Sequence, residues 1–200
     1  MTVTLPIEVG SDLVLIARTP DIAVPYHDLV LANRARLAQW EPWAERGMTL
    51  SQVRRWLSEG LAGLADGTQV PCVMVVAGHP GAPGLLVGSI GLAVDRTQGS
   101  AVAGYWVDAG HEGRGLITRS MVALLEVAFE QLRLRRVTLH ISPDNVRSQA
   151  VAGRLGFARE GVLRDAMVFR DRRADLDVHA MTRERYTEVQ ASAGAVRQGA

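Results

Sequence analysis

Residues 105–118 read Tyr105-Trp-Val-Asp-Ala-Gly-His-Glu-Gly-Arg-Gly-Leu-Ile-Thr118, and they join an apolar, strand-like segment to a long amphipathic helix. Gly113 and Gly115 allow neighbouring backbone N–H groups to point into one concavity, with the positive end of the helix dipole behind them. A loop of this kind is suited to holding phosphate. A second polar cluster, Asn145-Val-Arg-Ser148, follows further along the chain. Each cluster alone is a weak signal, but the ordered pair is specific.

Hydrophobic periodicity predicts the elements around these clusters. The apolar stripe of the helix after the glycine loop consists of Ile117, Met121, Leu125, Ala128 and Leu132. Two helices are predicted upstream: one over residues 21–39 that begins near Pro25, and one that opens at Thr49 with the capping-box pattern Thr49-x-x-Gln52. A short helix is predicted over residues 145–155. Strands are predicted at residues 13–17, 70–77, 85–94, 101–107, 137–141, 162–170 and 175–183.

This order of elements predicts a single three-layer domain over residues 1–186, of the α/β (α+β) class, with a mixed sheet carrying helices. A Gly/Pro-rich turn is expected at residues 78–84. Residues 187–200 lose periodicity and predict a flexible C-terminal tail. A hydrophobic fraction of 48% and a formal net charge of +1 argue against a disordered protein and against a strongly basic nucleic-acid binder.

The chain has one cysteine, Cys72, which excludes a disulfide framework and a cysteine-based metal cluster. Cys72 lies in an apolar run, so we interpret it as a buried structural thiol. The histidines show no metal-ligand spacing, and no metal is implied. The N-terminus lacks the features of a signal peptide, and no apolar stretch reaches membrane-spanning length. We therefore expect a cytoplasmic protein with no membrane partner.

The two clusters resemble those of the GNAT superfamily of N-acetyltransferases. Within it, the chain looks most like the branch that acetylates ribosomal-protein N-termini, the RimJ/RimL type. The resemblance runs from Leu13 to Tyr186. It implies a GNAT-type three-layer domain with a mixed, mostly antiparallel sheet. It also implies acetyl-CoA, or another acyl-CoA, as co-substrate, and a protein or peptide N-terminal α-amine as acceptor.

The resemblance also implies which residues bind the cofactor. The strand that ends at Val107 would pair with the pantetheine arm, and backbone amides of the glycine loop would face the diphosphate. An Asn-x-x-Ser helix start would line the acyl end. The cofactor-binding residues implied are Val107, Glu112, Gly113, Arg114, Gly115, Leu116, Thr118 and Asn145. Two structural alternatives stay open, since the glycines also suit a tight turn and Asn145 suits a helix N-cap.

The catalytic residues follow from the same resemblance. Much of the superfamily has a tyrosine where this chain has Ala152, so the usual acid is missing. The ribosomal branch places a serine at the position of Ser148, which would hydrogen-bond or protonate the leaving thiolate. Asp108, His111 and Glu112 near the end of the strand are candidates for the base, with Asp108 the nearest carboxylate, and His140 on the next strand is another. Asp108 also suits a turn cap, and His140 also suits a packing or surface role. An α-amine titrates near ~8, so a base has to give only modest help in removing its proton at neutral pH.

The segment Trp40-Glu-Pro-Trp43 resembles the region that walls the acceptor site in the ribosomal branch. We therefore predict Trp40, Trp43 and Arg46 as acceptor residues, with Arg46 reading charge. The two tryptophans could equally have a structural role and pack a helix against the sheet. Glu41 is only a weak sign of a cationic acceptor.

Other functions stay open. The acceptor could be a small amine such as an antibiotic or polyamine, and the acyl group could be longer, as in succinyl-CoA. A non-enzymatic CoA-binding sensor or interaction module is a further alternative. A nucleotide-binding αβ module is disfavoured, because the chain has neither Gly-x-Gly-x-x-Gly nor a Walker lysine. A homodimer through an edge strand is plausible from the fold alone.

Overall fold

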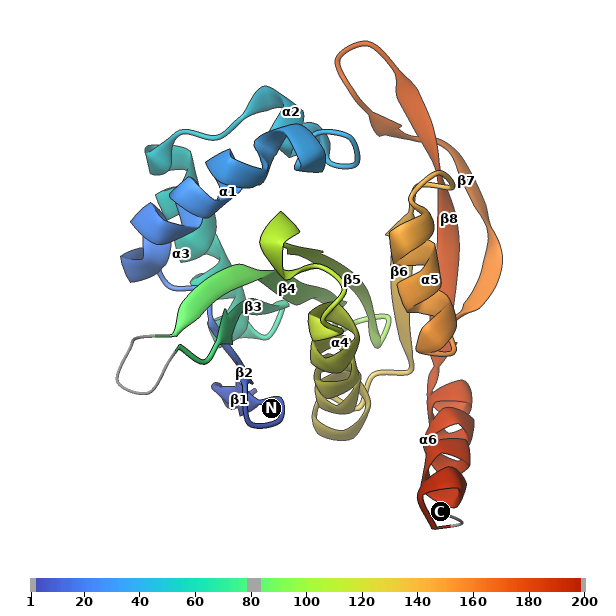
Figure 1. Ribbon diagram of the computed structural model, residues 1–200. Helices are drawn as coiled ribbons and strands as arrows, with labels where there is room; N and C mark the ends of the chain where they lie inside the picture. The colour runs from blue at the N-terminus through green and yellow to red at the C-terminus, as the bar shows by residue number, and fades with distance from the viewer. Residues whose placement is uncertain (1–2, 79–83, 199–200) are drawn as a thin grey trace.

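One eight-stranded sheet forms the centre of the computed structural model, which describes residues 3–78 and 84–198 (Figure 1). Its strand order is β1-β2-β3-β4-β5-β6-β8-β7. All neighbouring strands are antiparallel except β5 and β6, which are parallel. The predicted mixed, mostly antiparallel sheet is confirmed. The strands are β1 (Ile7–Glu8), β2 (Leu13–Ala17), β3 (Gln69–Val76), β4 (Leu85–Asp95), β5 (Ser100–Val107), β6 (Arg136–Ile141), β7 (Ala158–Val168) and β8 (Arg173–Thr182).

Helices cover both faces of this sheet and give the three layers. α1 (Ala23–Leu37) and α3 (Leu50–Asp66) bury one face of β2–β4 through side chains such as Tyr26, Leu57 and Val73. The opposite face packs against α4 (Leu116–Glu126), which continues as a π-helical turn (Val127–Gln131), and against α5 (Val146–Arg154). The alternation of strand residues separates the two faces, so that Val73 joins one cluster and Met74 the other.

The sheet opens between β5 and β6. The two strands pair only at Ser100–Arg136, Ala101–Val137 and Val102–Thr138. Beyond these pairs β5 continues to Val107 and β6 to Ile141, each without the other as a partner. Figure 1 shows the resulting gap between the half of the molecule that carries α1–α4 and the half that carries α5. Splayed parallel strands leave backbone groups free on both edges of such a gap.

Most predicted element boundaries agree closely with the structure. Thr49 caps α3 as predicted: the N–H of Gln52 donates to Thr49 Oγ1 (3.3 Å), and the N–H of Thr49 donates to Gln52 Oε1 (2.8 Å). α1 begins at Ala23 rather than near Pro25, because proline lacks only an N–H that the first turn does not need. The predicted helix over residues 21–39 begins in the structure as a 3₁₀ turn at Pro20–Ile22. The sequence analysis missed β1, a 3₁₀ turn at Ala109–His111 and the short helix α2 (Pro42–Arg46).

The predicted C-terminal tail needs a correction, because α6 (Arg183–Gln198) includes residues 187–198. Tyr186 stacks on Phe129 with ring centroids 4.7 Å apart, and Val189 packs against the main core. Tyr186 and Val189 lie near the start of α6, where so short an apolar pattern is hard to recognise in the sequence. The predicted turn at 78–84 lies largely in residues 79–83, outside the described residues. Among the helices of the described residues, none combines the length and the apolar character needed to cross a bilayer.

Candidate active site

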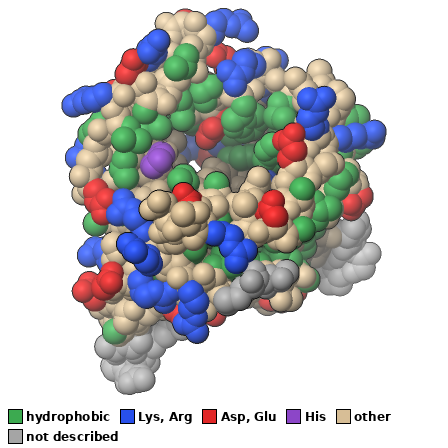
Figure 2. All heavy atoms as spheres, turned by 180° about the vertical axis from the view of Figure 1, so that it is seen from behind, with side chains coloured by type: hydrophobic (Ala, Val, Ile, Leu, Met, Phe, Trp, Pro, Cys, Tyr) green, Lys and Arg blue, Asp and Glu red, His purple; other side chains and the backbone are tan. Residues whose placement is uncertain are grey.

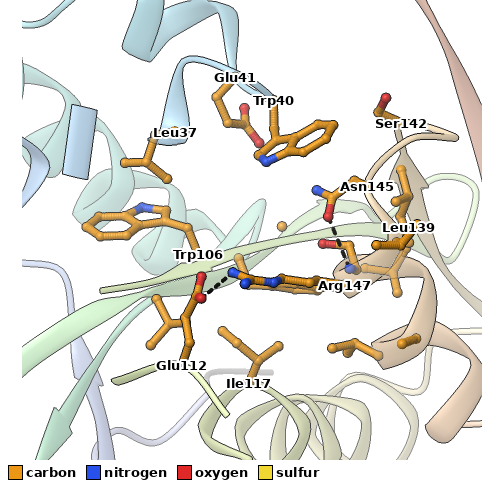
Figure 3. Close-up of a pocket in the computed structure, with 18 of the residues that line it drawn as sticks. Leu37, Trp40, Glu41, Trp106, Glu112, Ile117, Leu139, Ser142, Asn145 and Arg147 are labelled. Carbon is orange, nitrogen blue, oxygen red and sulfur yellow. Dashed lines mark hydrogen bonds and ion pairs between the residues drawn. The ribbon is translucent and has the colours of Figure 1, made fainter. Parts of the chain in front are cut away.

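The gap between β5 and β6 holds a cleft of about 990 Å³. In Figure 3, Trp40 and Glu41 lie on one wall, Leu139 and Asn145 lie on the opposite wall, and Ile117 comes from α4 below them. Figure 2 shows, from behind, that the molecule is hollowed at its middle and that hydrophobic side chains gather around the hollow. The splay of the sheet therefore produces a deep site bordered by the start of α4 and the start of α5.

The glycine loop forms one end of this cleft. Gly113 has φ 74° and Gly115 has φ 70°, the left-handed conformation that glycine adopts without strain. A Cβ added at either glycine would meet no heavy atom within 4 Å, so the space beside the loop is open. No side chain caps α4, and the first N–H groups of a helix have no partner within it. This open cradle fits an anion such as a diphosphate.

Glu112 uses its side chain to connect three elements around the loop. Arg36 Nη1 donates to Glu112 Oε1 at 2.8 Å, and Arg147 Nη1 donates to Glu112 Oε2. Figure 3 shows the second pair, which links the loop to α5. Arg36 also donates to the carbonyl of Val107. One lone pair of that carbonyl is thus already used, which limits the pairing with pantetheine that the resemblance implies at Val107.

The other predicted cofactor residues divide into two groups. Leu116 and Thr118 line the cleft together with Gly113 and Gly115. Arg114 is exposed outside the cleft lining, and its Nη2 donates to the carbonyl of Gly110 at 3.3 Å. The structure therefore places the backbone of the loop, rather than the Arg114 side chain, at the cleft.

Asn145 and Ser148 lie at the start of α5, and both line the cleft. Asn145 is the N-cap, since its Oδ1 accepts from the N–H of Ser148 at 3.2 Å. The capping alternative is thus present, and the cap bond also fixes the orientation of the Asn145 side chain at the wall of the cleft. Ala152, where a tyrosine would stand in much of the superfamily, is fully buried.

Tyr105 is a cleft residue that the sequence analysis missed. Its hydroxyl is buried and has no hydrogen-bond partner in good geometry among the described residues. Burial raises the pKa of Tyr105, while the nearby Ser148 hydroxyl and the positive charge of Arg154 oppose the shift. A buried hydroxyl from β5 therefore lies beside a hydroxyl from α5, across the splayed strands.

The two predicted bases have different surroundings. The Asp108 carboxylate accepts from Asn33 Nδ2 (2.7 Å), from the N–H of Gly110 (3.0 Å) and from His111 Nδ1 (2.9 Å). The hydrogen bond from Asn33 contributes most to lowering the pKa of Asp108. Asp108 does not line the cleft, so its geometry is that of a turn cap rather than a base. His140 does line the cleft, and burial together with the charge of Arg136 lowers its pKa.

The three predicted acceptor residues lie in different parts of the structure. Trp40 lines the cleft, and Trp43 lines a second pocket of about 460 Å³. Arg46 is exposed and lines neither cavity. Glu41 lines both cavities and accepts from Trp43 Nε1 at 3.0 Å. Burial raises the pKa of Glu41, and the hydrogen bond from Trp43 opposes the rise. The structure thus places a half-buried carboxylate where the sequence analysis had seen only a weak charge signal.

Known proteins share this architecture. The profile of the family described as acetyltransferase (GNAT) domain matches residues 13–158. The ribosomal-protein-serine acetyltransferase of Escherichia coli (strain K12) is 27% identical over 178 residues, which is 88% of this chain and 96% of that protein.

Solved structures show the same fold. The ribosomal alpha-N-protein acetyltransferase RimL in complex with coenzyme A has a TM-score of 0.82 at 24% identity, over 89% of this chain and 98% of that chain. Mycobacterium smegmatis RimJ in complex with CoA-disulfide has a TM-score of 0.77 at 24% identity, over 91% of this chain and 89% of that chain. The family profile spans most of the chain, from β2 to the start of β7. The chain therefore belongs to the GNAT acetyltransferase family.

Proposed function

We propose that this protein transfers the acetyl group of acetyl-CoA to the α-amine at a protein or peptide N-terminus. The observation that carries the proposal is one continuous cleft, which has the glycine loop at one end and is lined by Tyr105 and Ser148. The relatives named above support an α-amine acceptor, since one acts on serine of ribosomal proteins and another is an alpha-N-protein acetyltransferase.

The glycine loop fits the diphosphate of acetyl-CoA. Its free amides and the hydroxyl of Thr118 would hold the phosphoryl oxygens, while the gap between β5 and β6 admits the pantetheine arm. Asn145 would offer its side-chain amide nitrogen to that arm, because its Oδ1 already caps α5. The chain contributes anchoring and orientation, and the thioester contributes the activated acetyl group.

The chemistry requires a neutral amine and a stabilised leaving group. The amine nitrogen attacks the thioester carbonyl carbon, a C–N bond forms, and the C–S bond breaks with its electron pair left on sulfur. The nitrogen loses one proton to a base and the thiolate gains one. Tyr105 is the candidate to donate that proton, because its phenol is protonated at neutral pH and the Ser148 side chain lies near it. Ser148 would hydrogen-bond the sulfur beside it.

Glu41 is the base that the geometry favours. Figure 3 shows its carboxylate pointing into the cavity from the wall opposite Asn145. Its raised pKa brings the carboxylate closer to the pKa of the amine from which it takes the proton. His140 is the second candidate, since its lowered pKa keeps the imidazole neutral and able to accept. The cytoplasmic location and the homodimer remain predictions.

The test follows thiol release from acetyl-CoA in the presence of amidated peptides that begin with serine, with mass spectrometry to locate the acetyl group. We expect acetylation of the α-amine. Ser148→Ala and Tyr105→Phe should each lower kcat by about 10- to 100-fold, and the double variant should lose more, because both hydroxyls stabilise the leaving thiolate. Ser58→Ala, which removes an exposed hydroxyl on α3, is the matched control. Full turnover in the double variant would remove both hydroxyls from the mechanism, and thiol release that no amine stimulates would contradict the transferase.

A further inference from the structure

The second pocket lies beside the active-site cleft, and residues 103–106 of β5 line both cavities. We call it the aromatic pocket; its side chains include Arg18, Tyr26, Glu41, Trp43, Trp56 and Trp106. The centroid of the Tyr26 ring lies 5.3 Å from that of Trp56 and 5.9 Å from that of Trp106. Packed rings of this kind keep water away from a bound group and make polar contacts inside the pocket stronger.

Arg18 is the one cation among the described residues that line the aromatic pocket. It follows β2, and its guanidinium lies 3.8 Å from the centroid of the Trp56 ring. Its Nε is buried and has no hydrogen-bond partner among the described residues. Burial lowers the pKa of Arg18, and the only groups that oppose this shift are Tyr26 and Cys72.

Neither of these two groups supplies a counter-ion. Burial raises the pKa of Tyr26, and it raises the pKa of Cys72 to about 12, so both are neutral near pH 7. The guanidinium therefore has aromatic contact without an anionic partner. A partly buried cation without a counter-ion is less well solvated than an exposed one, and its guanidinium is suited to bind an incoming carboxylate through charge-assisted hydrogen bonds.

The positions of Glu41 and Arg18 indicate how a ligand would lie across the two cavities. Glu41 lines both cavities, so it marks the place where the aromatic pocket meets the cleft. Arg18 lines only the aromatic pocket. A ligand that spans the two cavities thus meets a carboxylate at the junction and a guanidinium beyond it. This arrangement matches a molecule with an amine at one end and an anion at the other.

We propose that the aromatic pocket binds a carboxylate of the acceptor, held by the Arg18 guanidinium, while the amine of the acceptor lies near Glu41. This inference rests on the proposed N-acetyltransferase function and adds a substrate class, acceptors with a carboxylate close to the reacting amine. That carboxylate comes either from an acidic side chain next to a peptide N-terminus or from the α-carboxylate of a free amino acid.

The experiment compares acceptors that differ only in this charge. One pair is the amidated peptides Ser-Asp-Ala-Ala and Ser-Asn-Ala-Ala, and the other is free serine and serinamide. We expect kcat/KM to favour the charged member of one pair by about 10- to 100-fold, and the pair that shows the preference identifies the source of the carboxylate. Arg18→Met should bring that ratio close to one, and Arg18→Lys should retain part of it.

The control is Arg55→Met, which removes the same charge from an exposed position next to Trp56 and should leave the ratio as in the wild type. The melting temperature of the unliganded protein is measured for each variant. The melting temperature should stay about the same or rise in Arg18→Met, because the charge removed is partly buried and has no ion pair among the described residues. A large fall in melting temperature with an intact charge preference would give Arg18 a structural role only and overturn the inference.

Equal rates for both members of each pair would also overturn the inference, while leaving the acetyltransferase proposal standing. No acetylation of any of the four acceptors, with CoA binding intact, would contradict the proposed function and the inference with it.

Discussion

Ser148 and Tyr105 illustrate what a sequence can and cannot reveal about single residues. The spacing of Ser148 from Asn145 predicts its place on the first turn of a helix, and the structure puts it at the cleft. Tyr105 belongs to the same quoted stretch as the glycine loop, yet nothing in its spacing shows that its hydroxyl lies beside Ser148. That proximity depends on how far β5 and β6 diverge, which is a property of the folded sheet.

Glu41 should set the acidic limb of the pH profile. A carboxylate accepts a proton only when ionised, and burial raises the pKa of Glu41, so activity should fall as pH decreases through a pKa above that of an ordinary glutamate. Glu41→Gln should remove this carboxylate-dependent fall and lower kcat/KM at pH 7 by about 100-fold, while the separate titration of the acceptor α-amine near ~8 should persist in both proteins. The measurement is kcat/KM from pH 5 to pH 9.

His140→Gln is the matched comparison, because His140 lines the same cleft. If the fall at acidic pH that we assign to Glu41 persists in Glu41→Gln and disappears in His140→Gln, His140 is the base and the assignment of Glu41 is wrong.

Arg18 and Glu41 show why the charges of the acceptor region were hard to predict. Both belong to segments that read as ordinary surface positions next to a strand or a short turn. Their burial follows from the way α1, α2 and α3 fold over the sheet, which places the tryptophans around them. Asp108 is the opposite case. Its sequence position suggested a base, but three hydrogen bonds commit its carboxylate to the turn before α4.

The junction of β5 and α4 is the element that sequence reasoning predicted best. Strong apolar periodicity predicted the helix, and paired glycines predicted the turn that begins it. The weakly amphipathic and very short elements, α6 and α2, were missed because hydrophobic periodicity requires several turns to be visible. Local sequence therefore predicted the turn and helix at the glycine loop better than the short elements around α2.

A substitution in the glycine loop tests that element. Gly115→Ala should destabilise the protein by only about 1 kcal/mol, since the cost is the left-handed backbone and the new Cβ meets no neighbour. The same Cβ projects into the open cradle, so the affinity for CoA should fall by about 10-fold or more. Calorimetric titration with CoA and thermal melting measure the two effects.

Gly99→Ala is the control, because Gly99 also has positive φ (62°) and lies in the turn between β4 and β5, outside the cleft lining. It should cost similar stability and keep the affinity for CoA. Equal CoA affinity in Gly115→Ala and Gly99→Ala would mean that phosphate does not bind at the loop.

At the scale of the whole molecule, the two halves on either side of the cleft also meet at its rim. The N–H of Arg170, between β7 and β8, donates to Glu45 Oε2 at 2.8 Å. Arg172 Nη2 donates to the carbonyl of Gln39 at 2.8 Å. These contacts join the tip of the β7–β8 hairpin to the segment around α2, so they help to hold the acceptor end of the cleft together.

Loss of the Arg172 contact should therefore affect the acceptor more than the cofactor. Arg172→Ala should raise KM for the acceptor peptide by about 3- to 10-fold, as expected for one hydrogen bond from a charged group, and leave the Kd for CoA within about twofold. The control is Arg173→Ala, which removes an ion pair with Asp165 inside the same hairpin. A parallel loss of CoA affinity in Arg172→Ala would show that the hairpin supports the whole cleft.

The short pairing of β5 with β6 turns the sheet into a wedge whose closed end is the region around Val102 and Thr138. Thr138 Oγ1 donates to the buried carbonyl of Ala101 there, at 3.4 Å. Small rotations at the apex of a wedge become larger displacements at its mouth. Evolution can therefore adjust the spacing between the two reacting walls through side chains that never touch either substrate.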